Sequence, residues 1–331
     1  MDPHSPARAD ALHLLPSTEA WESENVSTAA AMPDALPTWQ RQARGFLEMT
    51  RPSVVALVFF TGVPALAIDT GGVWPAWTRS AIILLGIAFC AGSSSVFNAW
   101  IERDLDARME RTRNRPLPTG LIKPNHALTW AWLLALGGCA LLWWQAGSPA
   151  AFGWQGALAG ALTIAFYVFV YTIWLKPRTP LNIVIGGAAG AAPPMIVDAC
   201  LTGGVGLMSF TLFALVFLWT PPHFWAISLF RKADYRNAGF PMMPLTHGDE
   251  ATRLRMTLYA LSLVPVACLP ALTGHLSVGY GLFAMAASIW FAWKCVQLWR
   301  GRSDALARTA FFASLVYLHV LFTAMTIDLL I

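Results

Sequence analysis

Charged side chains are scarce in this sequence. Only 12% of its 331 residues are Asp, Glu, Lys or Arg, and 56% are hydrophobic, whereas a water-soluble domain usually carries about a quarter charged residues. There is too little charge to cover a water-facing surface. The composition therefore excludes a soluble globular domain and predicts a protein of the lipid bilayer, for which we expect no nucleic-acid partner.

Closely spaced cysteines are also missing. The five cysteines lie far apart, and none belongs to a CxxC or Cys/His pattern, which zinc sites and redox pairs use. We expect them to be small packed or lipid-facing residues. They are Cys90, Cys139, Cys200, Cys268 and Cys295.

The first 45 residues lack apolar periodicity and mix Asp, Glu, Ser, Pro and Ala. Such a segment cannot bury enough apolar surface to offset the entropy of ordering, so we expect residues 1–45 to form a disordered cytoplasmic tail. The tail has no short apolar core of a secretory signal, and its acidic residues are unlike a transit peptide. A bacterial inner (cytoplasmic) membrane is the favoured location.

Long apolar runs fill the rest of the chain. A transmembrane helix needs about 20 apolar residues, and nine stretches qualify, with short connectors between them. They predict an all-α integral membrane bundle of nine helices, and one polytopic domain over residues 46–331. The stretches are 53–70, 80–100, 127–145, 152–174, 181–200, 207–228, 254–273, 276–296 and 308–329.

The fifth stretch is rich in small residues. Its run GGAAGAAPP suits close approach of helix backbones, and Pro193 and Pro194 should interrupt the helix. Asp198 follows near the outer end of this stretch. We expect it to cap that end of the span rather than to take part in catalysis.

Lys and Arg are distributed unevenly among the connectors. Cytoplasmic loops retain these residues, and with the N-terminus inside, only Arg79 falls on the outer side. Adding or removing one span would move later basic loops to the wrong face. This asymmetry favours nine spans, a cytoplasmic N-terminus and an outer C-terminus.

A first polar motif follows the second apolar stretch, in NAWIERDLDARMERTRNRPLPTG (98–120). Asn98, Glu102 and Asp106 are spaced four residues apart, so a helix aligns them on one stripe. Carboxylates on one stripe repel each other unless a cation bridges them, and Mg²⁺ binds one or two carboxylates together with phosphate oxygens. Asp104 lies off the stripe and is expected to be an ordinary helix-end charge.

Arginines follow the stripe at 111, 113 and 115, before Pro116 and Pro118, which should end the helix. A guanidinium group can bind two phosphate oxygens at once. Carboxylates for a metal ion beside arginines for phosphate therefore indicate a diphosphate site. The alternative is a solvated loop whose arginines only set topology. The stripe favours the functional interpretation because it begins inside an apolar helix, where polar groups are costly.

A second motif, WTPPHFWAISLFRKADYRNAGFPMMP (219–244), follows the sixth stretch. Pro221 and Pro222 should break or kink the helix near His223, and a resumed helix would place Asp234 roughly on the same face. The two motifs would then face each other across a central cavity open to the cytoplasmic side. A histidine that only packs or forms a hydrogen bond is an equal alternative for His223.

The two motifs resemble those of the intramembrane UbiA-type prenyltransferase superfamily, in which an NxxxDxxxD pattern and a second acidic motif bind Mg²⁺ and a prenyl diphosphate. Glu102 stands where the usual residue is Asp, and His223 stands where many members have Asp. With YTIWLKPRTPLNIVIGGAAGAAPPMI (171–196), the second motif looks like the haem-prenylating branch. The resemblance covers about residues 40–331.

The resemblance implies transfer of a farnesyl group from farnesyl diphosphate to a vinyl group of haem b, and a downstream haem A synthase as a partner. It implies Mg²⁺ ligands at Asn98, Glu102, Asp106 and Asp234. Diphosphate contacts are implied at Arg113, Arg115, Lys176, Arg231 and Lys232. His223 is the candidate for haem contact or proton transfer, with His319 second. Aromatic candidates for the isoprenoid cavity are Phe166, Tyr167, Tyr171, Phe224 and Trp225.

Two other functions stay open from the sequence. A transporter also has many polar, Gly/Pro-broken spans, but its sites usually lie near the membrane midplane, whereas here the charges gather at one face. A prenyltransferase acting on a quinone precursor or chlorophyllide is expected to carry Asp at position 223, where this chain has His.

Overall fold

The computed structural model describes residues 37–110, 112–145, 152–237 and 239–331. The predicted tail falls mostly outside these residues, but its end does not: Thr38–Met49 forms helix α2, so disorder was the wrong prediction for residues 38–45. Packing explains the order. Gly45 is buried, and a Cβ atom at this position would lie within 3.4 Å of side-chain atoms of Pro116, Leu121 and Ile122.

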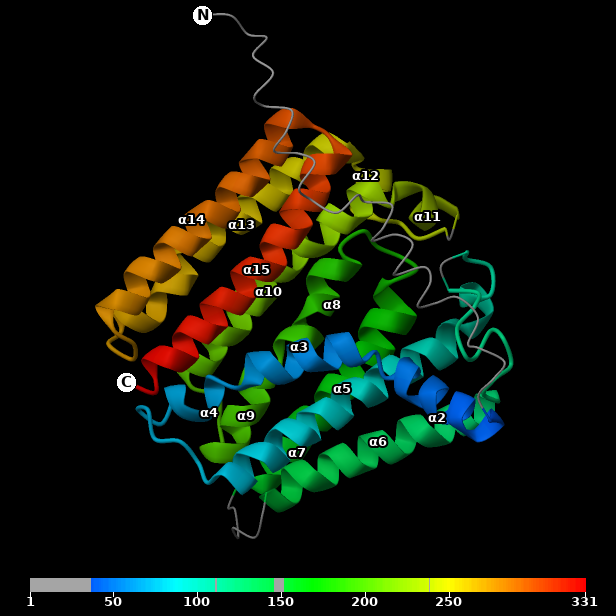
Figure 1. Cartoon of the computed structure of the whole chain (residues 1–331), viewed down its shortest axis with the longest axis horizontal. Coiled ribbons are helices and arrows are strands. Elements are labelled where there is room, and N and C mark those ends of the chain that lie inside the picture. Colours follow the sequence, from blue (N-terminus) through cyan, green and yellow to red (C-terminus); the bar gives the residue numbers. More distant parts are fainter. Residues whose placement is uncertain (1–36, 111, 146–151, 238) are drawn as a thin grey trace, which may run out of the picture.

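The described residues are helical almost throughout. After α2, the chain forms elements that Figure 1 follows from blue to red. They are α3 (Pro52–Gly62), α4 (Ala65–Ile68), α5 (Trp77–Asp106), α6 (Pro124–Trp144), α7 (Gly153–Ala165), the π-helix η4 (Phe166–Leu175), α8 (Asn182–Ala191), α9 (Pro193–Leu201), α10 (Leu207–Phe230), α11 (Lys232–Asn237), α12 (Met243–Thr246), α13 (Gly248–Leu272), α14 (Val278–Gly301) and α15 (Asp304–Asp328).

Within the described ranges, eight helices are long and apolar enough to cross a membrane. A ninth span results when α2 is taken together with the segment Pro52–Ile68, which is bent from it by 47°. The structure is therefore that of a multi-pass membrane protein with eight or nine spans. The first predicted stretch, 53–70, corresponds to α3 and α4, which are separated by a short break.

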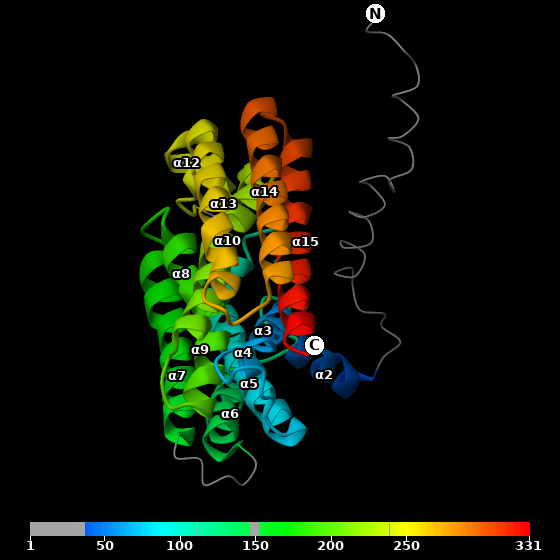
Figure 2. The same cartoon turned by 90° about the vertical axis from the view of Figure 1, so that its left-hand side faces the viewer.

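Helix α10 lies centrally in the bundle and packs against α8, α9, α13 and α15. Figures 1 and 2 show α13, α14 and α15 side by side on one flank, with α5, α6 and α7 together on the other. The long helices of the two flanks run obliquely to one another (Figure 1). The polar motifs are carried by the ends of α5 and α10, one in each half of this arrangement.

The two double-proline segments behave differently. Ala192 separates α8 from α9 immediately before Pro193, which confirms the predicted interruption. Helix α10 instead continues through Pro221 and Pro222, so the predicted break near His223 was wrong. Tertiary packing on several sides holds α10 together, and the Thr220 hydroxyl donates a hydrogen bond to the Val216 carbonyl at 2.7 Å, next to the carbonyls that the prolines leave without donors.

Small residues of α8 allow the close packing expected from the GGAAGAAPP run. A Cβ atom at Gly186 would lie 2.1 Å from the Tyr171 ring, and one at Gly187 would lie 2.9 Å from Thr220 Cγ2. Neither position has room for a side chain. Glycine at these two positions therefore lets η4 and α10 lie directly on α8.

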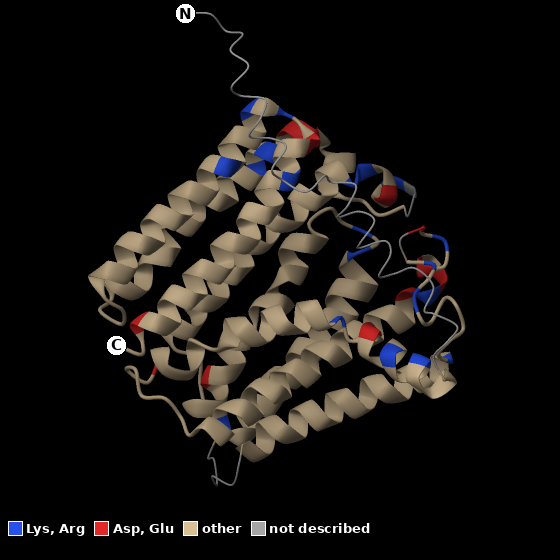
Figure 3. Ribbon diagram, viewed as in Figure 1, with Lys and Arg blue, Asp and Glu red and all other residues tan. Residues whose placement is uncertain are grey.

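Lys and Arg gather at one end of the bundle, as Figure 3 shows in blue. Asp198 lies at the opposite end and is buried. Its carboxylate accepts hydrogen bonds from the Gly206 amide at 2.5 Å and the Ser209 hydroxyl at 2.7 Å, at the start of α10. The expectation that Asp198 caps this end of the chain is confirmed.

Candidate active site

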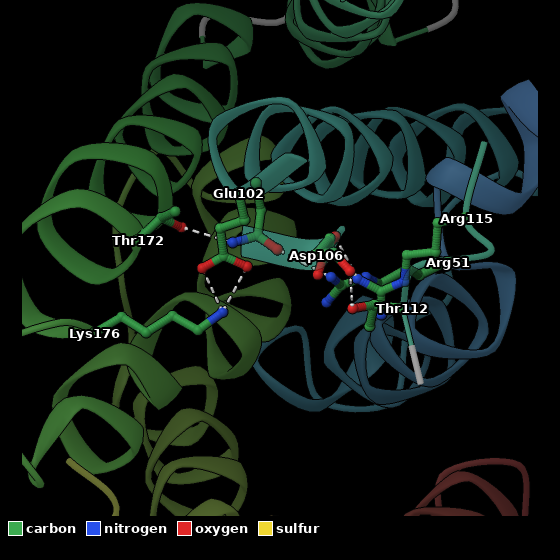
Figure 4. A network of polar contacts seen from close by, with 8 residues as sticks. Arg51, Glu102, Asp106, Thr112, Arg115, Thr172 and Lys176 are labelled. Carbon is green, nitrogen blue, oxygen red and sulfur yellow. Dashed lines mark hydrogen bonds and ion pairs between the residues drawn. The ribbon is translucent and has the colours of Figure 1, made fainter. Parts of the chain in front are cut away.

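The last two turns of α5 carry the predicted polar stripe. Asn98 and Asp106 are buried, with 1% and 5% of their surfaces exposed, and Figure 4 shows the side chains of Glu102 and Asp106 between cationic groups from other elements. The four-residue spacing therefore places three oxygen-bearing groups along one buried face of the helix. Asp104, off this stripe, has 81% of its side chain exposed, as expected.

Glu102 forms an ion pair with Lys176, the residue that follows η4. The Lys176 ammonium lies 2.5 Å from one carboxylate oxygen and 2.7 Å from the other, and the two side chains are 20% and 11% exposed. Burial lowers the pKa of Lys176, and the neighbouring Glu102 charge opposes that shift. The pair joins the end of α5 to the end of η4.

Asp106 is paired with Arg115 at 2.8 Å, which is the second ion pair of the stripe. The sequence predicted that Pro116 would end the helix, but α5 ends earlier, at Asp106 itself. The Asp106 carbonyl accepts the Thr112 hydroxyl at 2.8 Å, which turns the chain back so that Arg115 reaches the carboxylate. Arg113 is exposed on the same loop, and Arg111 lies outside the described residues.

Arg51 is a third cation at the stripe. Its guanidinium donates to Asn98 Oδ1 at 2.9 Å, while the Asn98 amide donates to the Thr172 hydroxyl at 3.3 Å. Arg51 stands between α2 and α3 and adopts φ 53°, ψ 70°, a left-handed conformation that is strained for a residue with a side chain. Strain at a polar residue that contacts the stripe is typical of functional sites.

A cavity of about 320 Å³ opens beside these groups. Arg51, Asp106 and Arg115 supply its charged lining together with Glu48. The remaining lining residues come from α2, α3, α5 and the loop after α5, and are Met49, Pro52, Ser53, Val54, Ala99, Pro116, Leu117 and Pro118. The cavity therefore combines guanidinium groups and carboxylates with an apolar wall.

The second motif is less closely assembled. Asp234 lies on α11, is 41% exposed, and pairs with Arg231 at 3.7 Å, while Lys232 pairs with Asp249 at 2.6 Å. Because α10 ends at Phe230, α11 is a separate helix, and the predicted alignment of Asp234 with His223 on one resumed helix was wrong. Lys176 connects the two motifs, because its ammonium pairs with Glu102 and lies 4.9 Å from the centre of the Phe240 ring.

His223 is buried among aromatic rings between α10 and α15. Its Nδ1 lies 2.7 Å from the Ser314 hydroxyl, and its ring stacks on Trp219 at 4.4 Å. This is a well-packed, hydrogen-bonded position. His319 is exposed, bonds through Nδ1 to the Leu315 carbonyl at 2.8 Å and stacks on Phe60 at 5.1 Å.

The aromatic residues predicted to line the isoprenoid cavity do not all lie near the site. Tyr167 lines an apolar pocket next to the site, and Tyr171 lies 5.9 Å from the Lys176 ammonium. Trp225 instead packs in a separate apolar cluster with Met256 and Leu298. Its contribution to an isoprenoid cavity is therefore not supported by its position.

The stripe offers an amide oxygen from Asn98 and carboxylate oxygens from Glu102 and Asp106. These are the kinds of ligand that Mg²⁺ prefers. In the part of the chain that the structure describes, no three His, Cys, Asp or Glu side chains gather closely enough to hold a metal ion. Glu102 and Asp106 instead face Lys176 and Arg115. A metal ion at the stripe would have to share these carboxylates with the two cations.

Sequence reasoning missed Arg51 as a site residue, because it was counted only among the charges that set topology. The available signal was its position directly before Pro52 at the start of a span, since a pre-proline residue is restricted in conformation. Thr172 was also missed. Its hydroxyl faces Asn98, but a threonine within an apolar run gives no such signal.

The protein is thus a multi-pass helical bundle with a carboxylate-and-guanidinium site at one end. The family model of the UbiA prenyltransferase family matches residues 57–316. The chain therefore belongs to the UbiA prenyltransferase family, a class of membrane-embedded transferases.

Curated relatives define the branch. Protoheme IX farnesyltransferase of Acidiphilium cryptum (strain JF-5) is 43% identical over 318 residues, which cover 92% of this chain and 98% of the relative. Protoheme IX farnesyltransferase of Parvibaculum lavamentivorans is 41% identical over 290 residues, which cover 86% and 89%. Within the family, the chain belongs with the protoheme IX farnesyltransferases.

Solved structures agree on the fold. A structure of digeranylgeranylglyceryl phosphate synthase superposes with a TM-score of 0.72 at 16% identity, covering 87% of this chain and 99% of that one. A UbiA homolog from Archaeoglobus fulgidus, bound to DMAPP and Mg²⁺, gives a TM-score of 0.60 at 18% identity, covering 85% and 99%. The helical membrane architecture is thus that of the family.

Proposed function

We propose that this protein transfers the farnesyl group of farnesyl diphosphate to a vinyl group of haem b, giving haem O and diphosphate. Membership of the protoheme IX farnesyltransferase branch supports the substrates. The observation that carries the proposal is the buried stripe of Asn98, Glu102 and Asp106, faced by Arg51, Arg115 and Lys176 beside a cavity of about 320 Å³.

The cationic side chains suit the departure of diphosphate. When the bond between farnesyl C1 and oxygen breaks, negative charge builds up on the leaving group, and positioned cations stabilise it. C1 joins the outer vinyl carbon, water adds as a hydroxyl to the carbon next to the ring, and a proton is released. Arg51, Arg115 and Lys176 are proposed as diphosphate ligands, with Arg113, Arg231 and Lys232 completing the set.

Mg²⁺ is the proposed cofactor, and Asn98, Glu102, Asp106 and Asp234 are its proposed ligands. When bound there with diphosphate, Mg²⁺ would neutralise charge on the leaving group and supply Lewis-acid chemistry. The oxygen donors of the stripe and the Mg²⁺ bound to the Archaeoglobus fulgidus homolog support this assignment. The second motif approaches the stripe through the contact of Phe240 with Lys176.

The basic end of the bundle is proposed to face the cytoplasm of a bacterial cell, with the C-terminus outside, because cytoplasmic loops retain Lys and Arg. Haem b and farnesyl diphosphate are then both taken from the inner leaflet or the cytoplasm. His223 remains the predicted haem-side residue, and a haem A synthase remains the predicted downstream partner.

The test is an assay of membranes that contain the protein. We expect haem b, farnesyl diphosphate and Mg²⁺ to yield a prenylated, hydrated haem that mass spectrometry detects. Asp106→Asn should reduce turnover by at least about 100-fold, a loss typical of groups that act at the reacting centre. The matched control is Asp104→Asn on the same helix turn, where the side chain is 81% exposed. Prenylation of an aromatic acid without prenylated haem would overturn the assignment of the acceptor.

A further inference from the structure

A second, apolar pocket of about 70 Å³ lies next to the polar cavity. Residues of α3, α5, α7, η4, α8 and α9 line it. They are Val54, Val58, Ile87, Cys90, Ala91, Ser94, Ser95, Thr163, Tyr167, Ala189, Gly190, Pro193 and Ile196. With ~10–15 Å³ for each water-sized group, the pocket has room for about five such groups, so it can take the last isoprene unit of a longer chain whose earlier units lie nearer the polar stripe.

The two cavities are neighbours, because Val54 lines both. Two of the hydroxyl groups that line the apolar pocket donate to carbonyls of their own helices. Ser94 donates to the Cys90 carbonyl at 2.9 Å, and Thr163 donates to the Ala159 carbonyl at 2.8 Å. The pocket therefore offers contact to an apolar chain whose charged end lies at Arg51 and Arg115.

The pocket extends away from the polar stripe along several helices at once. On α3 it runs from Val54 to Val58, and on α5 it runs from Ser95 to Ile87. It ends where helices meet closely. A Cβ atom at Gly62 would lie 3.0 Å from Leu84 Cδ2 and 3.6 Å from Val197 Cγ2, so α3, α5 and α9 close the pocket beyond Ile87.

Helix α5 gives the distance from the polar stripe to the closed end of this pocket. Eleven residues separate Ile87 from Asn98, and they rise about 16 Å in an α-helix. Three isoprene units extend about 15 Å, since ordinary carbon–carbon bonds give about 5 Å for each unit. A farnesyl chain that starts at the level of Asn98 thus ends at the level of Ile87, and a fourth unit would extend about 5 Å into closed packing.

We propose that this pocket measures the prenyl chain, with Ile87 and Ile196 at its closed end and Gly190 in its wall as the residues that set a length of three isoprene units. The inference rests on the proposed function and adds to it the determinant of chain-length specificity. Ile87 and Ile196 are 1% and 2% exposed and line the pocket. Gly190 lines the pocket, and a Cβ atom there would meet no atom within 4 Å, so this part of the wall has room for a larger side chain.

The first experiment lengthens the pocket. Ile87→Ala is compared with Ile83→Ala, which makes the same change at an equally buried position of α5 that does not line the pocket. Purified variants receive farnesyl and geranylgeranyl diphosphate in competition, with haem b as acceptor. We expect Ile87→Ala to shift the kcat/KM ratio toward geranylgeranyl diphosphate by roughly tenfold or more, and Ile83→Ala to leave the ratio unchanged.

The second experiment shortens the pocket and does not depend on removing core atoms. Gly190→Leu should abolish the use of farnesyl diphosphate while geranyl diphosphate is still accepted. Its control is Gly204→Leu, at another glycine whose Cβ would also meet no atom within 4 Å but which lies outside the pocket lining. Equal chain-length preference in Gly190→Leu, Ile87→Ala and the wild type would overturn the proposal.

A binding measurement separates this proposal from the proposed function. The rise in Tm of each variant is measured with non-hydrolysable geranyl, farnesyl and geranylgeranyl diphosphate analogues, without haem. A changed order of stabilisation in Ile87→Ala or Gly190→Leu supports the chain-length role even if no haem is prenylated. An unchanged order refutes that role, whereas farnesyl transfer to haem by the wild type would still stand.

Discussion

Two lysine–carboxylate pairs in this protein have nearly the same length and different burial, which allows a direct test of the energetics of the site. Lys176 and Glu102 lie 2.5 Å apart with side chains 20% and 11% exposed. Lys232 and Asp249 lie 2.6 Å apart with side chains 31% and 37% exposed. Breaking a buried pair leaves an uncompensated charge and costs about 3–5 kcal/mol, whereas exposed pairs contribute below about 1 kcal/mol.

Double-mutant cycles measure the difference. Glu102→Gln and Lys176→Met form one cycle, and Asp249→Asn and Lys232→Met form the control, each pair also combined in a double variant. We expect coupling free energies of about 3 kcal/mol for the buried pair and below about 1 kcal/mol for the control. At ~2 °C for each kcal/mol in a chain of this size, either single variant of the buried pair should lower Tm by about 6 °C.

The assay is unfolding of the purified protein in detergent micelles, followed by tryptophan fluorescence. The cycle removes the effect of Asp249 on Arg253, whose guanidinium lies 3.8 Å away, because both arms contain it. Equal coupling energies in the two pairs would refute the reasoning, since burial is the main difference between them. Additive single effects at Glu102 and Lys176 would refute the pair as an energetic unit.

Three further outcomes follow from the structure. Arg51→Gly should change the free energy of unfolding by less than about 1 kcal/mol, because relief of the φ 53° strain offsets the lost bond to Asn98, yet raise the KM for farnesyl diphosphate; an unchanged KM contradicts the diphosphate role. EDTA should abolish farnesyl transfer and Mg²⁺ should restore it; full turnover in excess EDTA contradicts the metal site. Asp69 accepts the Met208 and Ser209 amides at the start of α10, and burial, then the Asp198 charge, raises its pKa. The folded state therefore holds this proton to a higher pH than the unfolded state, whose carboxyl titrates near pH 3.8. Between pH 3.8 and the raised pKa, deprotonation of Asp69 makes stability fall as pH rises, so the Tm difference between Asp69→Asn and the wild type should change with pH in this range. A pH-independent difference contradicts this role of Asp69.

The fold was largely predictable because hydropathy and the lysine–arginine asymmetry report directly on burial in lipid. The spacing of Asn98, Glu102 and Asp106 was equally informative, since it depends only on helix geometry. The failures concern residues whose conformation depends on distant neighbours. Pro221 and Pro222 look like helix breakers locally, but α10 continues through them because it is packed on several sides.

The partners of the stripe could not be predicted from spacing. Arg115 reaches Asp106 only because α5 ends at that residue and the following loop turns back. Lys176 reaches Glu102 because η4 places the end of a later span beside α5. Such contacts depend on how helices pack in three dimensions, and neither periodicity nor composition contains that information.

The ion pair between Glu102 and Lys176 also has a consequence for biogenesis. The ribosome makes Glu102 first, and Lys176 follows 74 residues later, after α6 and α7 have been synthesised. An unpaired carboxylate is costly at membrane depth, so we expect Glu102 to stay in contact with water until η4 has been inserted. The Glu102–Lys176 pair can form only after that step, so we expect this end of α5 to reach its final packing late in synthesis.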